Sequence, residues 1–143
     1  MIAVDTNILI YAHREEFSQH RAARKALVQL AEGPAAWALP VFCLGEFLRI
    51  STHPRLFNPP FSAKEATEAL RRVLASPSVR VLIPGAAYPD LLLRAVRDSG
   101  ATGNLVFDAQ IAALCEESGV STLLTEDRDF ARFPSVRSKR LDG

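Results

Sequence analysis

Short apolar runs alternate with longer amphipathic stretches along almost the whole chain, and this alternation restricts the possible folds more than any other feature. A parallel sheet requires this order, because each connection between parallel strands must cross back over the sheet. We therefore predict an α/β fold in which a parallel sheet of four to five strands is covered by helices on both faces. The predicted strands cover residues 2–4, 35–39, 79–83 and 121–125, with a weaker fifth at 136–140.

The amphipathic stretches have apolar residues at helical spacing and recognisable start and stop signals. Gly33-Pro34 ends one of them. Ser62 and Asn104 are predicted to cap two others, and Thr6 or Asn7 is predicted to cap the first. The predicted helices cover residues 8–13, 20–32, 41–51, 63–75, 88–98 and 105–117, and a single helical turn is expected shortly after the fourth strand.

The composition describes a chain that can bury a core of its own. Its 143 residues are 48% hydrophobic and 23% charged, which is typical of a soluble globular protein, and we predict a single domain over residues 1–143. No apolar run is long enough to cross a bilayer. Because Asp5 interrupts the apolar start of the chain, we expect no secretory signal and predict a cytoplasmic location.

Two acidic residues follow predicted strands. Asp5 ends the first strand, and Asp127 lies two residues beyond the fourth. In open parallel sheets, ligands bind outside the carboxyl ends of the strands. We therefore expect Asp5 and Asp127 to lie at the same edge of the sheet, where a ligand would bind.

Two further acids stand on apolar faces of predicted helices. Asp108 has Ile111, Ala112 and Cys115 at helical spacing, and it lies near the start of its helix, where the dipole favours an anion. Glu46 sits among aromatic and aliphatic residues. Burying a lone carboxylate costs on the order of several kcal/mol, so these acids need a partner. Both helices follow strands, which brings their early residues toward the edge that holds the other two acids.

The four acids together predict a metal site. Carboxylates that are packed together repel one another, and a divalent cation removes that repulsion. Mg²⁺ and Mn²⁺ suit carboxylate and water ligands. The cluster lacks an adjacent histidine or cysteine, which argues against zinc. Cys43 and Cys115 form no ligand pair and are predicted to be buried, reduced thiols.

Four segments, taken in order, resemble the PIN-domain ribonucleases, and within them the VapC-type toxins of bacterial toxin–antitoxin systems. These segments are Val4-Asp5-Thr6-Asn7-Ile8-Leu9, Glu46-Phe47-Leu48-Arg49, Gly103-Asn104-Leu105-Val106-Phe107-Asp108-Ala109 and Thr125-Glu126-Asp127-Arg128-Asp129-Phe130. The likeness spans nearly the whole chain. Each motif alone is weak, whereas four of them in the right order are specific.

The resemblance implies a PIN-like three-layer sandwich and Mg²⁺- or Mn²⁺-dependent hydrolysis of RNA phosphodiester bonds. It implies that Asn7 and Thr125 support the site by hydrogen bonding, and that Asp129 is a further candidate. In the Asp127-Arg128-Asp129 stretch we favour Asp127 as the fourth acid and interpret Asp129 as a helix cap. The catalytic and metal-binding residues implied by the resemblance are Asp5, Glu46, Asp108 and Asp127.

The resemblance also implies three partners: an RNA substrate, a small cognate antitoxin protein and a second copy of the chain in a homodimer. The net charge of +1 gives no overall sign of nucleic-acid binding, so phosphate contacts must come from local arginines. Arg49 and Arg128 are the preferred RNA-binding candidates because each lies close in sequence to a site acid. Arg14, Arg55 and Arg132 are further candidates.

Two other classes of protein share part of this pattern. An aspartyl-phosphate phosphatase also begins with an aspartate at a strand end, but its chemistry needs a second aspartate two residues later, where this chain has Asn7. The alternative that stays open is a catalytically inactive PIN-like module that only binds RNA or a protein. The number of metal ions, one or two, is also left open.

Overall fold

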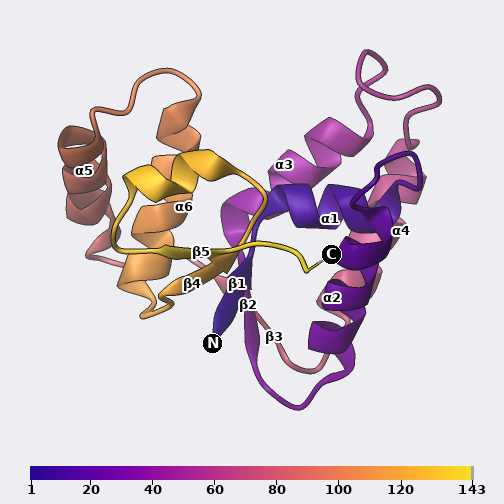
Figure 1. The fold of residues 1–143 in the computed structure, drawn as a ribbon, viewed down its shortest axis with the longest axis horizontal. Coiled ribbons are helices and arrows are strands. Elements are labelled where there is room, and N and C mark those ends of the chain that lie inside the picture. Colours follow the sequence, from indigo (N-terminus) through magenta and orange to yellow (C-terminus); the bar gives the residue numbers. More distant parts are fainter. Residues whose placement is uncertain (143) are drawn as a thin grey trace.

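The computed structural model describes residues 1–142. Within these residues five strands form one sheet in the order β3-β2-β1-β4-β5, and every neighbouring pair is parallel (Figure 1). This arrangement confirms the predicted α/β fold with a parallel sheet. The strands are β1 (Ile2–Val4), β2 (Trp37–Pro40), β3 (Val79–Leu82), β4 (Thr122–Leu124) and β5 (Arg137–Lys139).

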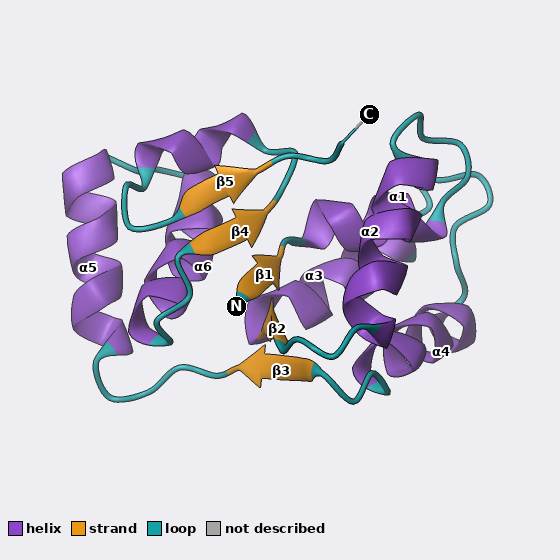
Figure 2. Ribbon diagram, turned by 60° about the horizontal axis from the view of Figure 1, so that its bottom comes forward, coloured by secondary structure: helices purple, strands orange, loops and turns teal. Residues whose placement is uncertain are grey.

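Helices cover both faces of the sheet. Helices α5 and α6 lie on one side of it, and α1, α2 and α4 lie on the other (Figure 2). Among the described residues no helix combines the length and the apolarity that crossing a membrane requires. The helices are α1 (Thr6–His13), α2 (His20–Glu32), α3 (Val41–Ser51), α4 (Ala63–Leu74), α5 (Tyr88–Ser99) and α6 (Leu105–Glu117), and a 3₁₀ helix, η1, covers Arg128–Arg132.

The core lies where the central strands meet the helices. All four residues of β2 are buried, and Trp37 on that strand has no exposed surface. Such strands, covered on both faces, are expected to be apolar throughout rather than alternating. Cys43 and Cys115 are also buried as free thiols, as predicted.

The strand order reverses at β1, and this reversal locates the binding edge. From β1 the chain builds outward through β2 to β3, and then returns to add β4 and β5 on the other side of β1. Open α/β sheets bind ligands at such a switch point, outside the carboxyl ends of the strands. The register pairs Val4 with Leu124, so the residues that follow, Asp5 and Thr125, emerge side by side.

The caps of the helices agree with the predictions only in part. Ser62 caps α4 in a full capping box, in which its hydroxyl accepts from the Glu65 N–H, as expected from the sequence. The prediction for α1 was wrong, because Asp5 occupies the cap position and its carboxylate accepts from the Thr6 N–H. Asn104 precedes α6 but makes no side-chain cap bond.

Candidate active site

Asp5 occupies the switch point and is almost completely buried, with 5% of its surface exposed. Its Oδ1 accepts from the Thr6 N–H at 2.7 Å, and its Oδ2 accepts from the Thr125 hydroxyl at 2.7 Å. Burial raises the pKa of Asp5 from 3.8 to about 6, although both hydrogen bonds act to lower it. The burial of the charged form therefore outweighs the hydrogen bonds that stabilise it.

The Thr125 hydroxyl connects three of the predicted site residues. It donates to Asp5, accepts from the Asp127 N–H at 3.0 Å and accepts from Asn7 Nδ2 at 3.3 Å. The Asn7 side-chain oxygen in turn accepts from the Glu126 N–H at 3.4 Å. The ends of β1 and β4 are thus joined by side-chain hydrogen bonds as well as by the sheet.

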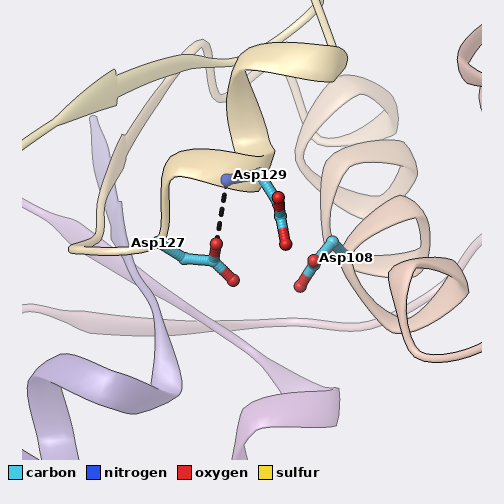
Figure 3. Close-up of side chains that lie close together, drawn as sticks. All are labelled: Asp108, Asp127 and Asp129. Atoms are coloured by element: carbon cyan, nitrogen blue, oxygen red, sulfur yellow. Dashed lines mark hydrogen bonds between the residues drawn. The ribbon is translucent and has the colours of Figure 1, made fainter.

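Asp108 lies in the first turn of α6, with Asp127 and Asp129 facing it (Figure 3). The pKa of its carboxyl is raised from 3.8 to about 7, first by burial and then by the negative charges of Asp127, Asp5, Asp129 and Glu46. A helix N-terminus favours an anion, but here burial and the neighbouring acids prevail. Burial is thus the main cause of the raised pKa, and the neighbouring carboxylates add to it.

Asp127 and Asp129 lie at the start of η1, which turns them toward α6. Asp127 caps η1, and its Oδ1 accepts from the Asp129 N–H at 2.9 Å (Figure 3). The interpretation of Asp129 as the helix cap was therefore wrong, because Asp127 occupies the cap position. Asp108, Asp127 and Asp129 each offer one carboxylate oxygen, and these oxygens lie within 4.8 Å of one another.

Glu46 reaches the same region from α3 and is half-buried. Its negative charge contributes to the raised pKa values of Asp5 and Asp108. A cavity of about 470 Å³ brings the four predicted acids and Asn7 together with an apolar wall. This cavity is lined by Asp5, Asn7, Ile10, Tyr11, Phe17, Glu46, Ile50, Leu56, Phe57, Asp108 and Asp127.

The donor atoms at this edge are suited to a hard divalent cation. Carboxylate oxygens are the ligands that Mg²⁺ and Mn²⁺ prefer, and a cation offsets the mutual repulsion that raises the pKa of Asp108. No histidine or cysteine is among the residues that line the cavity. The arrangement is therefore an acidic cluster that lacks the nitrogen and sulfur ligands typical of zinc sites.

The arginine candidates are placed very differently. Arg49 and Arg128 are exposed, and Arg128 lines a shallow hollow beside Asp127 together with Arg140. Arg14 is 8% exposed, and its guanidinium pairs with Glu16 at 2.8 Å and donates to the Pro59 carbonyl at 2.9 Å. Its prediction as a phosphate ligand was wrong, because the side chain is buried and its Nε and Nη2 already donate to Glu16 and to the Pro59 carbonyl.

Sequence reasoning missed the apolar wall of the cavity. Tyr11 stands one helical turn after Asn7 on α1, a spacing that places both on one helix face and that was available as a signal. Phe17, Leu56 and Phe57 come from loops, and the packing of a loop cannot be predicted from the periodicity of apolar residues.

Comparison with known proteins identifies the chain. The PIN domain family model matches residues 2–136, and the chain belongs to that family. Over 144 residues it is 37% identical to the ribonuclease VapC43 of Mycobacterium tuberculosis, which covers 100% of this chain and 97% of that protein. It is 32% identical over 140 residues to the ribonuclease VapC25 of the same species, with 98% of each chain covered. Within the PIN family the chain is therefore a relative of the VapC ribonucleases.

Solved structures show the same fold at lower identity. VapBC2 from Rickettsia felis, bound to a DNA fragment from its promoter, matches with a TM-score of 0.68 and 20% identity over 99% of this chain and 100% of that one. The sarcin–ricin-loop-cleaving toxin VapC20 of Mycobacterium tuberculosis matches with a TM-score of 0.65 and 23% identity over 92% of this chain and 93% of that one.

Proposed function

We propose that this protein is a metal-dependent ribonuclease that hydrolyses RNA phosphodiester bonds and acts as the toxin of a type II toxin–antitoxin pair. The observation that carries the proposal is the gathering of Asp5, Glu46, Asp108 and Asp127 around one cavity at the switch point of the sheet. The full-length similarity to VapC ribonucleases supports RNA as the substrate.

The proposed cofactor is Mg²⁺ or Mn²⁺, held by the four predicted acids with Asp129 as a fifth candidate. Asp129 joins the set because its carboxylate oxygen lies within 4.8 Å of those of Asp108 and Asp127. A bound ion of this kind supplies Lewis acidity to the scissile phosphate and to the attacking water. The protein supplies the pocket that holds the acids in place.

The contribution of the surrounding residues is to orient the acids. Both oxygens of Asp5 accept hydrogen bonds, which prevents the carboxylate from rotating while leaving it further lone pairs for a ligand. The Thr125 hydroxyl holds the backbone at Asp127 as well, so one side chain orients two acids. Such preorganisation is what transition-state stabilisation requires of an active site.

RNA phosphates outside the cluster need positive partners. Arg128 and Arg140 line a hollow that also contains Asp127, and this places exposed guanidinium groups beside the acids. Arg49 follows Glu46 on α3 and is exposed. We propose that Arg128 and Arg49 bind phosphates that flank the cleaved bond. An RNA target also implies that the protein acts in the cytoplasm.

The proposed protein partners are a small cognate antitoxin and a second copy of the chain. A toxin–antitoxin complex from Klebsiella pneumoniae has the same fold as this chain, with a TM-score of 0.62. For the homodimer, α5 offers an apolar surface: Leu93 is 69% exposed, and none of the residues of α5 is fully buried.

The test is cleavage of a labelled RNA by purified protein in Mg²⁺, in excess EDTA, and by an Asp5→Asn variant. We expect cleavage only by the wild type in Mg²⁺. Asp90→Asn, which changes an exposed acid of α5, is the matched control and should cleave as the wild type does. A folded Asp5→Asn protein that cleaves normally would show that the site assignment is wrong, and absence of cleavage by the wild type would favour the inactive-module interpretation.

A further inference from the structure

The cavity at the switch point has two halves of opposite chemistry. One half presents carboxylates and the Asn7 amide, as described above. The other half is an apolar wall that metal chemistry does not require. The aliphatic residues of this wall are Ile10 from α1 and Ile50 from α3. Its other residues are Tyr11, Phe17, Leu56 and Phe57.

The aromatic part of this wall is a chain of edge-to-face contacts. The rings of Tyr11 and Phe17 lie 5.0 Å apart at 65°, and those of Phe17 and Phe57 lie 6.0 Å apart at 83°. Tyr11 and Phe17 are only partly buried, so their rings supply the accessible aromatic surface, whereas Phe57 backs them from within the protein. Leu56 stands beside them with 56% of its surface exposed.

Arg14 fastens the loop that carries Leu56 and Phe57. Its guanidinium lies 4.4 Å from the centre of the Phe57 ring and 4.9 Å from that of Phe61, and it donates to the Pro59 carbonyl at 2.9 Å. Phe57 is consequently 7% exposed although it belongs to a loop. The wall is therefore preformed, which lowers the entropic cost of binding a ligand there.

We propose that Tyr11, Phe17 and Leu56, backed by the buried Phe57, form the binding seat for an unpaired nucleobase next to the cleaved phosphate; this rests on the proposed ribonuclease function. A ligand that fills both halves must carry an anion that a metal ion can bind and, a short distance away, a flat group that stacks on aromatic rings. A nucleotide has both. The cavity volume of about 470 Å³ lies within the ~300–1,000 Å³ range of small-molecule sites.

The seat also selects against duplex RNA. A base that is stacked and paired in a helix has no free face for Phe17 or Tyr11, whereas bases of loops and single strands are readily splayed out onto aromatic side chains. Phe17 and Leu56 are thus assigned as substrate-binding residues that favour cleavage next to unpaired bases.

The test compares Phe17→Leu and Leu56→Ala with the wild type on a 12-nucleotide RNA, single-stranded and annealed to its complement. Leu74→Ala, which trims an exposed leucine outside the cavity, is the matched control. We expect about a tenfold higher KM for the single strand in both variants, with kcat nearly unchanged, because base stacking contributes to binding rather than to bond cleavage. The wild type should prefer the single strand to the duplex by at least about tenfold.

A second readout does not depend on cleavage. The same RNA with 2-aminopurine in place of adenine, mixed with protein in Mg²⁺ and followed by stopped flow before turnover, should lose fluorescence on binding the wild type and lose less with Phe17→Leu. If the RNA bound with quenching but was not cleaved, the base-binding proposal would hold. The proposed nuclease function would then be wrong. If both variants cleaved RNA with the KM of the wild type and the fluorescence were not quenched, the base-binding proposal would be wrong. The apolar wall would then be a surface for a protein partner.

Discussion

The Thr125 hydroxyl donates to Oδ2 of Asp5 at 2.7 Å across 120 residues of chain, and it accepts from the Asp127 N–H at 3.0 Å. One hydroxyl therefore couples the acid that follows β1 to the acid that follows β4. Because Val4 and Leu124 are paired in the sheet, the strand register itself brings these partners together. The site is thus an extension of the sheet rather than a feature of a loop.

The coupling predicts the effect of Thr125→Val, which keeps the shape of the buried side chain and removes its hydroxyl. Asp5 loses a donor and the Asp127 N–H loses an acceptor, so the free energy of unfolding should fall by about 1–3 kcal/mol and RNA cleavage should fall with it. Urea unfolding measures the first and a cleavage assay the second. Thr67→Val, at an exposed hydroxyl on α4, is the control, and equal effects of the two changes would contradict the account.

The stability of the metal-free protein should depend on pH in an unusual direction. The pKa values of Asp5 and Asp108 are raised from 3.8 to about 6 and about 7, so between pH 4 and pH 7 the unfolded chain ionises these groups before the folded protein does. The contribution of Asp5 to the free energy of unfolding therefore falls as pH rises through this window, by as much as about 3 kcal/mol at about 1.4 kcal/mol per unit, whereas the lowered pKa of His13 acts in the opposite direction. Denaturation of the wild type and of Asp5→Asn in EDTA at several pH values isolates this contribution. The wild type should lose stability relative to the variant as pH rises, and a difference that stays constant from pH 4 to 7 would contradict the account.

The burial of the Asp108 carboxylate, together with the neighbouring negative charges, predicts that Asp108→Asn stabilises the metal-free protein. At pH 8 in EDTA the variant should have a higher melting temperature than the wild type. Its free energy of unfolding should be larger by about 1 kcal/mol, a value that allows for the partial exposure of Asp108. Asp90→Asn, which removes an exposed acid from the first turn of α5, should not raise the melting temperature. A lower melting temperature for Asp108→Asn would mean that the charge of Asp108 stabilises the fold, against the present interpretation.

Arg14 should matter for stability far more than an ordinary surface arginine. Arg14→Met removes the ion pair with Glu16 and the bond to the Pro59 carbonyl, and we expect a loss of about 2 kcal/mol. Arg71→Met breaks the exposed pair with Glu68 and should cost less than about 0.5 kcal/mol. Chemical denaturation distinguishes the two, and similar losses for both variants would show that Arg14 does not hold its loop.

The sequence predicted those features of the fold that depend on patterns within one element. The bounds of α2 and α3 match the predictions, since apolar spacing and the glycine and proline stops are local signals. The shared edge of Asp5 and Asp127 also followed, because parallel strands place their ends together. RNA, the toxin role and the supporting residues came from the resemblance to VapC-type toxins.

Features that depend on packing between elements were not predictable. Asp127 rather than Asp129 caps η1 because the Thr125 hydroxyl holds the Asp127 N–H, a contact set by the sheet register. Arg14 looked like a free phosphate ligand, but it is buried against a loop 45 residues away in the sequence. Phe17, Leu56 and Phe57 come from two separate loops, whose packing against Tyr11 of α1 has no periodic signature.

The most direct measurement is a calorimetric titration of Mn²⁺ into the metal-free protein at pH 8, together with Asp108→Asn and Asp90→Asn. The account predicts saturable Mn²⁺ uptake by the wild type and by Asp90→Asn, and strongly weakened uptake by Asp108→Asn, whose carboxylate is part of the facing group of oxygens. Absence of Mn²⁺ binding by the wild type, or equal binding by the folded Asp108→Asn protein, would contradict it.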